Sequence, residues 1–200
     1  MKILALTGSV GMGKTTAARM LRRLGVPVHD ADAEVHRLLG PGGSAVAPVA
    51  AAFPGTRRGM TIDRTALGQL VFENPSALKR LEAILHPLVR EAERRFLARA
   101  RRERRPLVVL DIPLLFETGG ERRCDGVLVV SAPRAIQLAR LMSRPEMTAQ
   151  RLTAIEARQL PDAEKRSRAD WVIPTGLGRR ESLRRLRKVV RRLAKTGPAH

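Results

Sequence analysis

The sequence is poor in aromatic residues: its 200 residues include four Phe, one Trp and no Tyr. RRM and OB modules stack bases on aromatic side chains, and this chain has too few of them to build such a platform. Its charge favours the opposite conclusion, because 38 Lys and Arg against 19 acidic residues give a formal net charge of +19, and clustered bases bind phosphates. Because the aromatic platform is missing, we do not expect nucleic-acid binding as the main task. It stays an alternative that would use the Arg-rich segments around 94–105 and 179–192.

Cysteine and long apolar runs are also scarce. Cys124 is the single cysteine, so the chain forms neither an internal disulfide nor a Cys-ligated zinc site, and a reducing compartment fits. The first apolar run stops after Leu6, too early for a signal peptide, and the run at 45–53 contains a proline and is too short to span a bilayer. We expect a soluble cytoplasmic protein with no membrane partner.

The order of apolar runs predicts the fold class. Apolar residues make up 44% of the chain, enough for a buried core, and the length suits one α/β domain. Strands are predicted at 3–6, 26–28, 107–112, 127–131 and 171–173. Helices are predicted after the first strand, over 63–104 with breaks at Pro75 and Pro87, and at 134–143, 148–160 and 180–194. Residues 40–59, rich in Gly, Pro and Ala, are predicted as a loop or a loosely ordered insertion. Apolar strands separated by helices indicate a doubly wound parallel sheet.

Residues 8–15, GSVGMGKT, match the phosphate-loop pattern G-x-x-x-x-G-K-[ST] without a gap. Gly8, Gly11 and Gly13 let successive N–H groups converge on a phosphate, and the helix that follows adds its positive end. Lys14 is expected to reach the β- and γ-phosphates of ATP, and the Thr15 hydroxyl to ligate Mg²⁺. The alternative is a glycine-rich turn that merely links a strand to a helix, and it leaves Lys14 unexplained.

The class of nucleotide protein follows from another scarcity. The chain has one Asn, Asn74, and a proline follows it, so the Asn-Lys-x-Asp motif with which GTPases read guanine is missing. The chain is also too short for most motor or transporter ATPases. A small-molecule kinase is the class that remains.

Several acidic residues follow predicted strands. Asp30 and Asp32 come after the second strand, at the edge of the sheet where ligands bind in such folds. One of them can accept the proton of a substrate hydroxyl while the other supports Mg²⁺. Equally, the pair can form a turn and the N-cap of the next helix. Asp111 either supports Mg²⁺ or caps a turn, and Glu117 binds either the substrate or a nearby Arg.

Basic side chains gather on the predicted helices after the fourth strand: Arg140, Arg144, Arg151, Arg158, Lys165, Arg166 and Arg168. In phosphate-loop kinases such a segment closes over the triphosphate and excludes water. Most of these side chains are expected on a solvated helix face. Arg140 and Arg144 lie four residues apart on one face, and they are the candidates for contact with the γ-phosphate.

The sequence resembles the dephospho-coenzyme A kinase family. The segments that carry the resemblance follow the family order over nearly the whole chain: LTGSVGMGKT (6–15), DAD (30–32), LEAILHPLV (81–89), DIPLLFETG (111–119), QLARLMSR (137–144) and the run from Gln159 through Lys165 to Asp170. HPLV and PLLFE are the specific segments, because phosphate-loop kinases in general lack them. They also weigh against the alternative of another phosphate-loop kinase, one acting on a nucleoside monophosphate or a small alcohol.

The resemblance implies an activity: ATP-dependent phosphorylation of the ribose 3′-hydroxyl of dephospho-coenzyme A, which gives coenzyme A and ADP in the last step of coenzyme A synthesis. It implies that Asp32 is the general base, acting with Lys14 and the lid arginine Arg140. Substrate contacts are expected at Asp30, Glu117 and His86, although His86 has the alternative of a core histidine. The expected ATP site comprises Gly8, Gly11, Met12, Gly13, Lys14, Thr15, Thr16, Arg144 and Thr175, of which the resemblance implies the loop from Gly11 to Thr16. Mg²⁺ is expected at Thr15 and Asp111.

Two positions depart from the family pattern. Ser9 stands where the family usually has a second glycine, and Thr175 lies where an Asn-containing segment usually approaches the adenine. We expect one kinase domain over 1–200, as a monomer or small homo-oligomer with a small-molecule substrate. Its parts are a core (about 1–39, 105–139 and 169–200), a helical acceptor-binding region (about 60–104) and an Arg-rich lid (about 140–168).

Overall fold

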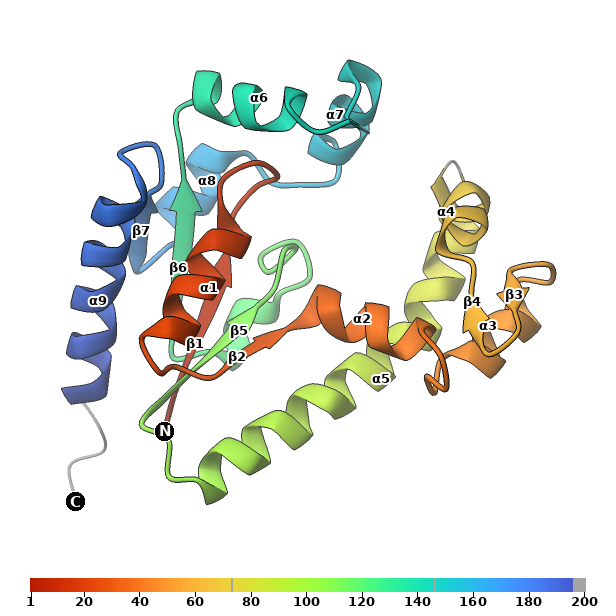
Figure 1. Cartoon of the computed structure of the whole chain (residues 1–200), viewed down its shortest axis with the longest axis horizontal. Helices are drawn as coiled ribbons and strands as arrows, with labels where there is room; N and C mark the ends of the chain where they lie inside the picture. The colour runs from red at the N-terminus through yellow and green to blue at the C-terminus, as the bar shows by residue number, and fades with distance from the viewer. Residues whose placement is uncertain (73, 146, 196–200) are drawn as a thin grey trace. The chain divides into compact units, whose positions relative to one another are not determined.

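In a computed structural model, which describes residues 1–72, 74–145 and 147–195, the chain forms two compact units (Figure 1). The first unit combines Met1–His29 with the chain from Ala100 onward, and the second is Asp30–Arg99. The predicted acceptor-binding region falls almost wholly in the second unit, which also includes residues 30–59. The predicted lid belongs to the first unit.

The first unit is built on a five-stranded sheet with the order β2-β5-β1-β6-β7. The strands are β1 (Lys2–Thr7), β2 (Val28–Asp30), β5 (Leu107–Asp111), β6 (Gly126–Ser131) and β7 (Trp171–Pro174). β1 pairs in parallel with β5 and β6, and β6 pairs in parallel with β7. Four of the five predicted runs form strands, whereas the second strand begins only at Val28, the last residue of its predicted range 26–28. The parallel pairing confirms the predicted sheet.

Alternate residues of the central strands enter different apolar clusters. Leu4 of β1 and Leu128 of β6 belong to a cluster that includes residues of the helices α1 (Lys14–Arg23) and α9 (Arg179–Lys195). Ala5 and Val127, one position away on the same strands, pack with Leu115, Phe116 and Leu160 on the other side. Successive strand residues point to opposite faces, so both faces of the sheet are covered, as a doubly wound fold requires.

The rest of the first unit consists of short helices after β5 and β6. A 3-10 helix covers Gly120–Arg123, and α6 (Arg134–Met142), α7 (Ala149–Glu156) and α8 (Asp162–Ser167) follow β6. The predicted lid is therefore two short helices and their connections, together with the end of α6. Within the described ranges no helix is both long and apolar enough to cross a membrane.

The second unit is mainly helical. It contains α2 (Ala31–Leu39), α3 (Val46–Ala52), a two-stranded antiparallel sheet of β3 (Arg57–Arg58) and β4 (Thr61–Ile62), α4 (Arg64–Phe72) and most of α5 (Pro75–Arg102). These elements enclose an apolar cluster of their own, with Leu38, Val49, Phe53, Leu67 and Leu85 among its buried members.

Two local predictions in this unit were wrong. Residues 40–59 are not simply a loop, because α3 forms there: its alanines favour a helix, and Val46, Val49 and Phe53 are buried at helical spacing. Pro87 also does not break the helix in which it lies, since α5 continues through it. Pro87 removes one hydrogen bond, to the Ala83 carbonyl, and both residues are exposed, where water can satisfy that carbonyl.

Candidate active site

The phosphate loop connects β1 to α1, the strand–loop–helix context that its motif predicts. Gly13 is the residue before α1 and has a φ of 90°, and Gly11 has a φ of 78°, a region that favours glycine. A Cβ on Gly11 would also lie 2.8 Å from Leu141 Cγ of α6. No side chain caps the N-terminus of α1 and its first turn holds no acidic residue, so the helix presents its positive end to an anion.

Three consecutive carbonyls of this loop accept hydrogen bonds from side chains: Val10 O from Gln137 Nε2 at 2.8 Å, Gly11 O from Arg140 Nη1 at 3.3 Å, and Met12 O from Thr175 Oγ1 at 2.8 Å. In a trans peptide the C=O and the next N–H point in opposite directions. The N–H groups of the three following residues therefore point away from these side chains. Met12 N–H donates to Ser9 O at 3.1 Å, whereas those of Gly11 and Gly13 have no acceptor in the described part of the chain. The loop thus offers unsatisfied donors to a phosphate.

Arg140 and Thr175 lie together at the loop. Arg140 Nη1 donates to Thr175 Oγ1 at 3.0 Å, and Nη2 donates to Thr175 O at 2.7 Å. Both were predicted at the ATP site, Arg140 for the γ-phosphate and Thr175 near the adenine. In the structure they bond to each other and to the carbonyl side of the loop. Arg144, just after α6, is exposed and its guanidinium has no partner among the described residues.

Lys14 and Asp111, distant in the sequence, meet at the start of α1. Lys14 Nζ donates to Asp111 Oδ1 at 2.8 Å, and the Asp111 side chain is only 2% exposed. The strand register explains the contact: β1 and β5 are parallel neighbours with Leu6 opposite Asp111, so the phosphate loop begins at the edge where β5 ends.

The predicted Mg²⁺ ligands fit that ion in type. Thr15 is exposed in the first turn of α1, next to Lys14, which contacts Asp111. Mg²⁺ prefers oxygen ligands and is usually held by one or two side chains together with substrate phosphates. In the described ranges no three His, Cys, Asp or Glu side chains are grouped closely enough to hold a metal by themselves.

The two aspartates after β2 differ in their surroundings. Asp30 is the N-cap of α2, and its Oδ1 accepts the Ala33 N–H at 3.0 Å. The capping alternative is therefore realised at Asp30. Asp32, in the first turn of α2, is exposed, and its carboxylate has no hydrogen bond or ion pair to a described residue. Of the two carboxylates, that of Asp32 is the one that no described residue binds.

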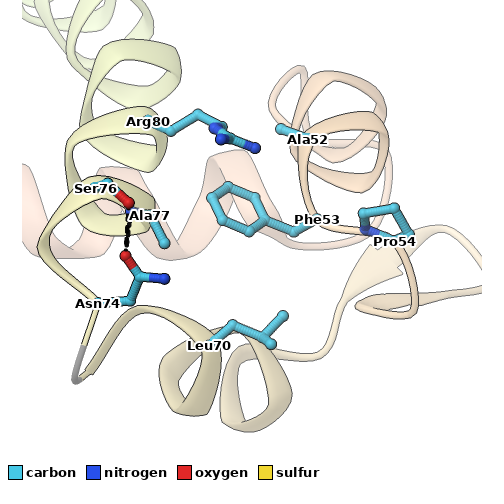
Figure 2. A pocket seen from close by; sticks show the side chains of 8 residues that line it. All are labelled: Ala52, Phe53, Pro54, Leu70, Asn74, Ser76, Ala77 and Arg80. Atoms are coloured by element: carbon cyan, nitrogen blue, oxygen red, sulfur yellow. Dashed lines mark hydrogen bonds between the residues drawn. The ribbon is translucent and has the colours of Figure 1, made fainter.

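His86 and a pocket are further features of the second unit. His86 lies on α5 and is exposed, so the alternative of a core histidine was wrong. A pocket of about 270 Å³ mixes apolar and polar side chains (Figure 2). It is lined by Ala52, Phe53, Pro54, Leu70, Asn74, Ser76, Ala77 and Arg80. None of the predicted acceptor contacts lines this pocket.

Glu117 is half of a buried ion pair. Lys165 is completely buried, and its Nζ lies 2.8 Å from Glu117 Oε1, which also accepts the Leu160 N–H at 2.8 Å. Burial raises the pKa of the Glu117 carboxyl, but the contact with Lys165 and the bond from Leu160 outweigh it, so the pKa lies below its ordinary value of 4.5. The predicted partner was the substrate or an Arg, and the structure shows a Lys.

Sequence reasoning assigned no role to Gln137 or Gln159. It counted Lys165 among the basic lid side chains that are expected mostly on a solvated helix face, whereas Lys165 is buried. Gln137 contacts the loop at Val10, as described above, and Gln159 Oε1 accepts the Val10 N–H at 3.1 Å. The signal available in the sequence was that all three lie in the segments that carry the family resemblance.

The chain is similar to known proteins over nearly its whole length. A family model described as Dephospho-CoA kinase matches residues 2–177. The dephospho-CoA kinase of Paramagnetospirillum magneticum is 69% identical over 166 residues, covering 83% of this chain and 78% of that protein. The dephospho-CoA kinase of Rhodospirillum rubrum is 62% identical over 187 residues, covering 92% and 88%. A solved structure from Thermus thermophilus has a TM-score of 0.85 at 40% identity and covers 98% of both chains.

The buried ion pair predicts a pH dependence of stability. Because the pKa of Glu117 lies below 4.5 in the folded chain, the pair contributes stability above pH 4.5, and this contribution is lost as the pH falls through the folded value. The double variant Glu117→Gln/Lys165→Met lacks both charges. Urea unfolding between about pH 6 and pH 3.5 is expected to show the wild type losing stability relative to the double variant. A difference that stays constant over this range would contradict the prediction.

Proposed function

Because the chain belongs to the dephospho-CoA kinase family and phosphorylates dephospho-coenzyme A, the last step of coenzyme A synthesis, we propose that the phosphate loop with Lys14 and Asp111 forms its phosphoryl-transfer site. The observation that carries the proposal is the 2.8 Å contact between Lys14 Nζ and Asp111 Oδ1. This contact joins the phosphate-loop motif to DIPLLFETG (111–119), which contains one of the two segments that specifically mark the family. The acceptor atom in this proposal is the 3′-hydroxyl oxygen of the ribose, and the products are coenzyme A and ADP.

On the donor side, ATP is proposed to bind by its phosphates. The N–H groups of Gly11 and Gly13 and the N-terminus of α1 supply donors and a positive potential. Lys14 adds a full charge at the β- and γ-phosphates, and Asp111 holds its ammonium at the loop. Mg²⁺, held by Thr15 and Asp111, would neutralise charge on the phosphate oxygens. Charge that develops during transfer is thus met by groups already in place.

On the acceptor side, Asp32 is proposed as the base. Phosphoryl transfer through a loose transition state needs little early deprotonation, so the carboxylate mainly orients the hydroxyl and takes its proton late. An exposed carboxylate with no partner among the described residues suits this task, whereas Asp30 is committed to its cap at Ala33. In this proposal Asp30 caps α2 and Glu117 pairs with Lys165, so neither contacts the substrate. His86 stays a predicted acceptor contact.

The two lid arginines are proposed to divide their tasks. Arg144 is exposed and unpartnered among the described residues, so it is the cation free to reach the γ-phosphate. Arg140 braces the loop from its carbonyl side together with Thr175. A cytoplasmic location and a monomeric or small homo-oligomeric state stay predictions.

The first test measures ADP release with ATP and dephospho-coenzyme A, with AMP and adenosine as competing acceptors. The wild type is expected to prefer dephospho-coenzyme A, and Lys14→Met to lower kcat by about 10²–10³-fold, because a preorganised charge at the transferring phosphoryl group is lost. Arg19→Met, an exposed basic position on the same helix, is the matched control and should retain activity. A folded Lys14→Met variant that keeps more than about a tenth of wild-type kcat would contradict the assignment of Lys14 to the phosphoryl-transfer site.

A second test separates the two aspartates. Asp32→Asn keeps the shape of the side chain but cannot take a proton, and it should lower kcat by about 10²–10⁴-fold with ATP binding preserved. Asp30→Asn should have little effect on the rate, because Asn caps a helix as well as Asp does. Single-turnover rates for both variants decide the matter. The assignment fails if Asp30→Asn loses the chemical step while Asp32→Asn keeps it.

A further inference from the structure

Val10, in the middle of the phosphate loop, is held on both of its backbone groups by glutamine side chains. Its carbonyl accepts from Gln137 Nε2 at 2.8 Å, and its N–H donates to Gln159 Oε1 at 3.1 Å. Gln137 lies on α6, whereas Gln159 lies between α7 and α8, in the predicted lid. A lid residue therefore bonds directly to the loop that is proposed to bind ATP.

The bond from Gln159 also orients the peptide before it. Because the Ser9–Val10 peptide is planar, a Val10 N–H directed at Gln159 turns the Ser9 carbonyl the opposite way. There the Ser9 carbonyl accepts the Met12 N–H at 3.1 Å, which closes the turn of the loop. Loss of the Gln159 acceptor would thus release the Val10 N–H and the orientation of the Ser9 carbonyl together.

A buried charge pair fixes the turn that carries Gln159. The next residue, Leu160, donates its N–H to Glu117 Oε1 at 2.8 Å and packs against the apolar cluster of Leu115 and Phe116. The same oxygen lies 2.8 Å from the Nζ of fully buried Lys165. Taking two charges out of water costs about as much as their attraction returns, so a buried pair is weak evidence for stability. What it does provide is a defined position for the Leu160 backbone.

The second glutamine depends on the same part of the lid. Gln137 Oε1 accepts from Arg134 Nη1 at 2.7 Å, and Arg134 in turn forms an ion pair with Glu156 of α7, with Nη2 to Oε2 at 3.1 Å. Both hydrogen bonds to Val10 are therefore connected to residues 156–165, one directly and one through Arg134.

We propose that Gln159, anchored by the buried Glu117–Lys165 pair, is a positioning residue that keeps the phosphate loop in the conformation that binds ATP. This inference rests on the proposed function of the loop. A loop that is correctly folded for only a fraction of the time binds ATP more weakly by that fraction. Loosening the loop therefore raises the KM for ATP and leaves the KM for the acceptor unchanged. A merely structural role would instead lower the amount of folded enzyme and leave both KM values unchanged.

The test starts with Gln159→Leu, which keeps most of the side-chain volume and removes the acceptor. ATP affinity, measured by calorimetry, is expected to fall about tenfold, as for a loop competent one tenth of the time. The KM for dephospho-coenzyme A should stay within about twofold of the wild type, which corresponds to about 0.4 kcal/mol. Gln150→Leu is the matched control, since Gln150 is an exposed glutamine of α7, and it should bind ATP like the wild type.

The anchor is tested by a pair of variants. Lys165→Met leaves the Glu117 carboxylate buried without its cation, and ATP affinity is expected to fall in the same way. Glu117→Gln/Lys165→Met removes both charges but keeps an amide oxygen that can accept the Leu160 N–H, so ATP affinity should recover to within about threefold of the wild type. If Lys165→Met does not fold, Gln159→Leu and the double variant still decide the proposal.

Two results would overturn the inference: ATP affinity of Gln159→Leu within twofold of the wild type, or a parallel rise in the KM of both substrates. Failure of the proposed function gives a different result, because a folded Lys14→Met variant would then keep the kcat of the wild type. The calorimetric comparison of ATP binding does not depend on that outcome.

Discussion

An anion site made of peptide N–H groups cannot use those groups to hold its own shape. Every N–H that is kept for a phosphate is a backbone donor withheld from the helix and sheet ladders that normally fix a chain. The shape then has to come from the carbonyl side, and here Gln137, Arg140 and Thr175 supply it at three consecutive peptides. The geometry of the phosphate loop is thus determined largely by side chains that bind its carbonyl groups.

The sheet places those supports within reach. Gln137 and Arg140 belong to α6, which follows β6, and Thr175 follows β7. Both strands lie on the same side of β1 in the sheet, whereas β5 on the other side contributes Asp111. Parallel pairing makes the chain leave each strand at the same edge, so segments far apart in the sequence converge around the loop after β1. The apolar core is what keeps the strands, and hence these segments, in register.

Sequence reasoning was strongest where the information is local. The phosphate loop is contiguous, the buried strands are short apolar runs, and the capping role of Asp30 was one of two alternatives stated from its position alone. Burial and helical spacing decided the cases it missed: α3 forms because Val46, Val49 and Phe53 reach the core, and α5 passes through Pro87 on an exposed face. The tasks of Gln137, Gln159 and Lys165 depend on partners in other segments. The position of a glutamine or a lysine in the sequence does not predict such a partner.

The connectivity of the two units determines the order in which a growing chain can complete them. The second unit, Asp30–Arg99, is continuous, whereas the first needs Met1–His29 together with residues from Ala100 onward. Chains fold as units while they emerge from the ribosome, so the second unit has all its residues before β1 has either of its neighbouring strands. The bond from Thr175 to the Met12 carbonyl spans 163 residues and is the last support of the phosphate loop to be synthesised. Although its motif is translated long before β7, the phosphate loop takes its final shape only after that last strand of the sheet has been synthesised.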